Sequence, residues 1–140
     1  MCIRLIILCV VFIFSFPLSP SFAAIDYGKQ SLIGADFSNS DLRGATFYLT
    51  DLHNANLSGS DLQGANLFGA KLEDADLRNA NLSDVTLDSA VLDGTNLTNT
   101  VLENAFAFNT RFINVEINGA DFTNVPLRND VLNKLCPIAE

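Results

Sequence analysis

The feature that most constrains this chain is a large apolar residue at every fifth position over most of its length. Leu, Phe or Ile occupies 19 of 20 consecutive positions of this row, which runs from Leu32 to Leu127, and Ala107 is the exception. A small or β-branched residue stands two positions before nearly every member, and Gly, Asn or Asp predominates two positions after it. So regular a pattern is typical of a repeat protein.

A period of five fits neither an α-helix nor a straight strand. Five helical residues advance the chain by about 500°, so successive leucines would spread round the helix. On a straight strand, an odd period sends alternate leucines to opposite faces. All of them can point inward only if the chain turns once per repeat, and Gly, Asn and Asp tolerate the dihedral angles of such turns. Four turns of about 90° close a square coil, so the pattern predicts about five stacked coils of 20 residues.

Many repeats share a signature of Ala, then Asp or Asn, then the large apolar residue. Clear copies are Ala35-Asp36-Phe37-Ser38-Asn39, Ala55-Asn56-Leu57-Ser58-Gly59 and Ala65-Asn66-Leu67-Phe68-Gly69. On these residues the chain resembles the pentapeptide-repeat family, over roughly residues 30–128. The resemblance implies an all-β solenoid, namely a right-handed quadrilateral β-helix. We expect its inward core to include Leu52, Leu57, Leu62, Leu67, Leu72, Leu77, Leu82 and Leu87.

Residues 1–23 have the composition of a secretory signal peptide. Arg4 precedes an apolar run from Leu5 to Phe16, and small residues follow as far as Ala23. The run has about twelve residues, fewer than the roughly 20 that span a bilayer. We therefore expect export and cleavage after Ala23, with membrane attachment only if the segment stays uncleaved.

The five-residue pattern gives way to a short helical pattern at the end of the chain. Residues 24–128 form the predicted repeat domain, and residues 129–140 the predicted C-terminal helical cap. Asn129 is the expected N-cap, and Val131, Leu132 and Leu135 are expected to cover the last coil.

Cys136 lies in this C-terminal segment, which is similar to the C-terminal helix of lumenal pentapeptide-repeat proteins of cyanobacteria and chloroplasts. The resemblance implies a disulfide between this cysteine and a second, later one. The sequence stops at Glu140 without a second one, so either the family disulfide is absent or the chain is truncated. Cys136 is then a free thiol, or a redox or disulfide site that bridges to another chain.

Composition excludes several classes of function. The chain has 16 Asp and Glu residues against 8 Lys and Arg, and removing Arg4 with the signal gives 7 − 16 = −9. Direct binding to nucleic acid is therefore not expected, because it needs positive charge. One His and three Cys are too few for a His/Cys metal centre, and no cofactor is expected. His53 lies at an outward position beside Asp51 and Asn54, with no nucleophile pattern around it, so we expect no enzyme activity.

One side of the predicted coil carries outward aromatic residues: Tyr48, Phe68, Phe106 and Phe108. A contiguous exposed apolar patch usually marks an interface, although ordinary stacking between coils also explains such residues. Around Ala107 two interpretations stay open. A local bulge turns Phe106 or Phe108 inward, or the register is kept and both rings stay outside.

Three functions are compatible with these observations. The first is a non-enzymatic interaction or scaffold module in the thylakoid lumen or periplasm, which binds an unknown protein partner or a second copy through the aromatic residues. The second is an acidic DNA mimic that binds a DNA-binding enzyme such as gyrase, as in the gyrase-protecting pentapeptide-repeat proteins to which the chain is also similar. The third is a calcium- or carbohydrate-binding accessory to an enzyme.

Overall fold

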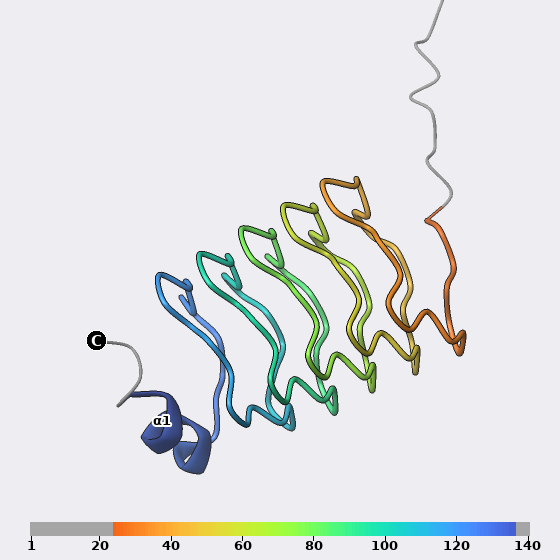
Figure 1. Ribbon diagram of the computed structural model, residues 1–140. Helices are drawn as coiled ribbons and strands as arrows, with labels where there is room; N and C mark the ends of the chain where they lie inside the picture. The colour runs from red at the N-terminus through yellow and green to blue at the C-terminus, as the bar shows by residue number, and fades with distance from the viewer. Residues whose placement is uncertain (1–23, 137–140) are drawn as a thin grey trace, which may run out of the picture.

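The computed structural model describes residues 24–136. These residues wind as a stack of similar coils, and helix α1 (Asn129–Leu135) lies at the C-terminal end of the stack (Figure 1). The signal peptide predicted for residues 1–23 and the last four residues of the predicted cap lie outside the described residues.

Neighbouring coils are joined in a strict register. A parallel β-bridge occurs at every fifth residue and always pairs it with the residue 20 positions later, from Asp26 with Thr46 to Val101 with Asp121. Each coil therefore has 20 residues and four sides of five residues each. This is the square coil that the period predicts. The right-handed sense implied by the family resemblance stays a prediction.

The sides of the coil are shorter than ordinary β-strands. Within residues 24–136 the pairing consists of isolated bridges, and no extended strand forms. The reason is that one residue of each five-residue side forms the bridge, and the residues after it are the inward residue and the turn. Describing the fold as all-β therefore overstates its strand content, although the coil-to-coil hydrogen bonds are those of a parallel ladder.

Nearly every corner is a tight turn that closes behind the inward residue. At a representative corner the N–H of Ala45 donates to the carbonyl of Leu42 at 3.0 Å, and Gly44 has a φ of 66°. A positive φ at the third residue alone is the mark of a type II turn. The Gly, Asn and Asp residues seen in the sequence therefore stand where the left-handed conformation is needed.

The inward row makes one continuous apolar core. Every leucine from Leu52 to Leu102 in this row is fully buried, and Ala side chains fill the corners beside them. Where Thr replaces Ala at a corner, its hydroxyl donates to a carbonyl of the preceding coil, as Thr95 does to Leu72 at 2.7 Å. The core thus contains polar groups only where each has an acceptor.

Aromatic rings close the N-terminal end of the core. The ring of Tyr27 stacks on Phe47 with centroids 5.0 Å apart and meets Phe37 edge-on at 5.3 Å. Ile25 is 48% exposed and adds little to this cover. These large rings therefore cover the core at the first coil, where no preceding coil within the described residues packs against it.

Helix α1 covers part of the other end and differs from its prediction in two respects. The N-cap is Arg128, not Asn129, because Arg128 keeps an extended conformation and its carbonyl accepts from Val131 and Leu132 at 3.0 Å each. Leu135 is buried and Val131 packs partly against the core, but Leu132 is 41% exposed. Val131 and Leu135 are four residues apart and share the helix face that meets the last coil.

We expect Leu77→Ala to lower the free energy of unfolding by about 2–5 kcal/mol, because it leaves a cavity in the middle coil. Leu77→Asp should prevent folding, since it buries a charge among leucines. Chemical denaturation checks this, with the exposed Glu103→Ala as control, expected to change stability by less than about 0.5 kcal/mol. A Leu77→Ala loss no larger than that of the control would contradict the packing described here.

Candidate protein-interaction face

One side of the stack carries the aromatic residues, and we call it the aromatic side. It comprises residues 46–50, 66–70, 86–90 and 106–110, which the bridges Thr46–Asn66, Asn66–Thr86 and Thr86–Phe106 hold in register. On this side of the stack, the register aligns the second residue of each turn with the residue 20 positions later. The column formed in this way is Tyr48, Phe68, Asp88 and Phe108.

The first two rings of the column stack on each other. The ring centroids of Tyr48 and Phe68 are 5.7 Å apart and the planes differ by 16°. The Lys29 ammonium lies over the outer face of Tyr48, 5.9 Å from the centroid. Tyr48 is 37% exposed and Phe68 is half-buried. This pair therefore contributes to coil-to-coil packing and also presents apolar surface.

Leu49 adds to this surface, and the sequence reasoning missed it. It has a φ of 54° at a turn position where most coils have Gly, Asn or Asp, and it is 46% exposed. Its side chain lies over Gly69, where an added Cβ would meet Leu49 Cδ2 at 2.6 Å. An aliphatic residue at a left-handed position was the signal that could have revealed it.

Phe106 and Phe108 form a second apolar group on the same side. They are 56% and 49% exposed, while Ala107 between them is 1% exposed. Phe106 keeps its bridge to Thr86, so the register is unbroken. The bulge interpretation is therefore wrong, and both rings lie outside because the inward position still belongs to residue 107.

Asp88 has a structural role where it interrupts the aromatic column. On the preceding coil, the N–H of Gly69 donates to the carbonyl of Asp88 at 3.1 Å. The corresponding bond from Ser89 to Phe108 is absent among the described residues, and the carboxylate of Asp88 instead accepts from the N–H of Asn109 at 3.0 Å. Asn109 also lacks the positive φ of the other corners. The turn that carries Phe108 is thus irregular, and Asp88 stabilises it.

The outward Asp and Asn residues at the first position of a side have a comparable local role. Their side-chain oxygen accepts the N–H two residues later, as in Asp36 with Ser38 at 3.0 Å and Asn56 with Ser58 at 3.1 Å. This bond from Ser38 lowers the pKa of Asp36. The side chain of Arg43 likewise lowers the pKa of Asp41 from 3.8 to about 2. The acidic residues therefore stabilise the turns that they start.

His53 lies in a small cluster of charged residues on another side of the stack. Its Nδ1 is 2.7 Å from an oxygen of Asp51, and its Nε2 is 3.4 Å from an oxygen of Glu73. The His53 side chain donates to Asp51 and lowers the pKa of that carboxyl. Both ring nitrogens are directed at carboxylates, so the arrangement orders the surface and offers no nucleophile.

Two further expectations concern metal binding and Cys136. Among residues 24–136, no group of three His, Cys, Asp or Glu side chains is arranged to hold a metal ion. Cys136 follows α1 as its C-cap and is exposed. It has no disulfide partner within the described part of the chain.

The repeat pattern matches a known family. The model of the family described as Pentapeptide repeats matches eight copies, over residues 31–69, 65–104 and 90–129. A search of curated proteins finds no match. No helix within residues 24–136 combines the length and the apolar character needed to cross a bilayer.

Several solved structures resemble the coil. A pentapeptide repeat protein from the thylakoid lumen of Arabidopsis thaliana is 42% identical with a TM-score of 0.78, over 79% of this chain and 77% of that one. A pentapeptide repeat protein from Nostoc Pcc 7120 is 33% identical with a TM-score of 0.50, over 74% and 84%. The protein Rfr23 from the cyanobacterium Cyanothece 51142 is 30% identical with a TM-score of 0.50, over 66% and 56%.

We expect the folded protein to lose stability in acid. Side-chain hydrogen bonds from Arg43 and Thr123 lower the pKa values of Asp41 and Asp121, and the backbone N–H of Ser38 lowers the pKa of Asp36. A carboxyl with a lowered pKa stabilises the fold above its unfolded pKa, and protonation removes this contribution. The melting temperature should therefore fall as the pH drops from about 3.8 towards about 2, the range through which Asp41 is shifted.

Thermal melts between about pH 5 and pH 2 measure this effect. The Asp41→Asn variant is the control, because it removes the most strongly shifted carboxyl and should show a shallower loss. A melting temperature that rises in acid, as relief of net negative charge alone would produce, would contradict the expectation.

Proposed function

Because the chain belongs to the pentapeptide-repeat family, we propose that it is a non-enzymatic protein-interaction module that binds a partner protein through its aromatic side. The observation that carries this proposal is the pair Phe106 and Phe108, two large rings about half exposed on either side of a buried alanine. Neither ring is needed to fill the core, since Ala107 occupies the inward position.

Physical arguments favour this surface for binding. An aromatic side chain buries about 150–250 Å² in a contact, and apolar area removed from water contributes about 25 cal/mol per Å². The bridges on both sides of the column fix the backbone beneath the rings. A surface that is ordered before binding loses less entropy when a partner docks.

The compartment is part of the proposal. We infer that the protein is exported and works in the thylakoid lumen or the periplasm. The apolar segment at residues 5–16 with small residues after it supports export. The lumenal origin of a solved relative with 42% identity supports the lumen.

The interaction is tested with the double variant Phe106→Ser and Phe108→Ser in the chain from residue 24 onward. We expect the melting temperature to change little and the association to be lost. Sedimentation detects a second copy as partner, and cross-linking in the soluble extracytoplasmic fraction of the host detects another protein. Ile33→Ser is the matched control, because Ile33 is 60% exposed on another side. Equal cross-linking yields for the native chain and the folded double variant would overturn the proposal.

The compartment is tested by fractionating the host and weighing the mature protein. We expect a soluble extracytoplasmic product that starts at Ala24. A cytoplasmic, uncleaved product would overturn the export assignment, and a gyrase-supercoiling assay would then be the next measurement.

A further inference from the structure

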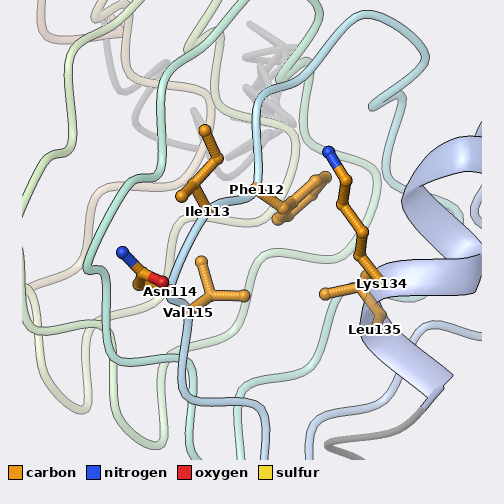
Figure 2. Close-up of a pocket in the computed structure, with 6 residues that line it drawn as sticks. All are labelled: Phe112, Ile113, Asn114, Val115, Lys134 and Leu135. Carbon is orange, nitrogen blue, oxygen red and sulfur yellow. The ribbon is translucent and has the colours of Figure 1, made fainter.

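A groove lies beside the contact between the last coil and α1. One part has a volume of about 480 Å³, and Figure 2 shows Lys134 and Leu135 on the helix facing the coil residues across it. An adjoining part of about 310 Å³ shares Phe112, Ile113 and Lys134 with it and extends to Arg111 and Arg128. We call the two parts the end groove.

The groove exists because the chain leaves the coil register at its end. If the five-residue period continued, residue 131 would form a bridge with Arg111, and Leu132 would point inward over Phe112. Residues 129–135 form α1 instead, and Leu132 is 41% exposed. A sixth coil would place one of its sides against residues 111–115. The helix does not fill this place.

The backbone edge of this side is unpaired among the described residues. On the coil before it, the N–H of Leu92 donates to Arg111 at 2.9 Å and the N–H of Gly94 donates to Ile113 at 2.8 Å. The equivalent donors one coil later are the N–H groups of Phe112 and Asn114, and neither has an acceptor within residues 24–136. Both residues line the groove. An edge of this kind is suited to pairing with an added strand.

Positive charge gathers around the groove in a chain that is otherwise acidic. Of the seven Lys and Arg residues that follow Arg4, three line it, and Asp130 is the one acidic residue in its lining. Arg111 is paired with Asp93 and Arg128 with Asp130, at 2.6 and 3.0 Å. Lys134 has no ion-pair partner within the described part of the chain. The lining carries three positive charges and one negative, while the whole chain carries −8.

The walls of the groove are apolar. Val115 and Leu135 face each other and belong to the buried core, each 6% exposed, while Ile113 is 42% exposed and presents the accessible apolar surface of the lining. Unpaired N–H groups, apolar walls and a cationic rim thus occur together in one groove.

We propose that the end groove binds an extended acidic peptide segment of a partner protein, which adds a short strand to the last coil. Carbonyls of the segment accept from the N–H groups of Phe112 and Asn114. Its apolar side chains pack against Ile113. Its carboxylates pair with Lys134 and with the outer edge of Arg128.

The unpaired N–H groups favour a peptide over an anionic lipid. A fatty acid would use the positive charge and the apolar walls, but its hydrocarbon chain would leave the N–H groups of Phe112 and Asn114 without acceptors. A peptide satisfies all three features of the groove.

The probe is a fluorescent decapeptide with the sequence of residues 84–93 of this chain, Asp-Val-Thr-Leu-Asp-Ser-Ala-Val-Leu-Asp. It carries three Asp carboxylates and no Lys, Arg or His, and in this fold its sequence covers the side of residues 86–90 and parts of the two sides next to it. Fluorescence anisotropy with the chain from residue 24 onward should show saturable binding that weakens as salt is added.

Matched variants locate the binding. Lys134→Glu and Arg128→Glu should each weaken it about fivefold or more, whereas Arg78→Glu should leave it unchanged. Arg78 and Arg128 have similar side-chain exposure, 54% and 51%, and each pairs with an aspartate two residues away. The Phe106→Ser, Phe108→Ser double variant should bind the peptide normally, so a failure here is distinguishable from a failure of the aromatic side.

Changes to the peptide test the mode of binding without altering the protein. Replacing its three Asp residues by Asn, or methylating alternate backbone nitrogens so that the strand cannot pair, should abolish binding. Absence of saturable binding would overturn the proposal, and so would equal affinity of the methylated peptide. Displacement of the peptide by laurate at concentrations below those of the peptide would also overturn it, in favour of a lipid site.

Discussion

The structure depends on one constraint, which is that the chain must turn after every inward residue to keep that residue inside. A type II turn satisfies it, and the left-handed residue of that turn accounts for the Gly, Asn and Asp of the sequence. The outward Asp or Asn at the start of a side then finds an N–H within reach, as Asp36 finds that of Ser38. Core, corners and the acidic surface therefore follow from a single backbone geometry, repeated in each coil.

Departures from that geometry coincide with the surfaces that we consider functional. The corner that carries Phe108 lacks the left-handed residue, and Asp88 replaces a backbone acceptor there. At the end of the stack, residues that continue the period form a helix, and within residues 24–136 they leave an unpaired edge. A regular repeat satisfies its own hydrogen bonds, so it offers a partner little. Its irregular places have groups left over for binding.

Most of the fold could be predicted from the sequence, because the large residue at every fifth position permits only one arrangement. The period of Leu52, Leu57 and Leu62 was enough to place them inside and to give the 20-residue coil. The exposure of Leu132 and the cap at Arg128 were missed, because the contact between a seven-residue helix and the coil depends on its orientation. The end groove was also missed. It depends on two N–H groups that have no acceptor in the described part of the chain, and no residue pattern marks such a feature.

The register of 20 residues has a consequence for how such a protein can change in length. Insertion or deletion of a whole coil would leave every column aligned. Loss of a single repeat of five residues would rotate everything after it by a quarter of a coil. Between Phe68 and Phe106, such a loss would carry the second aromatic group round to a different side of the stack. Selection on the aromatic side would therefore tolerate insertions and deletions of four repeats and oppose those of one, two or three. The number of repeats between two surface residues is thus itself a functional property of the sequence.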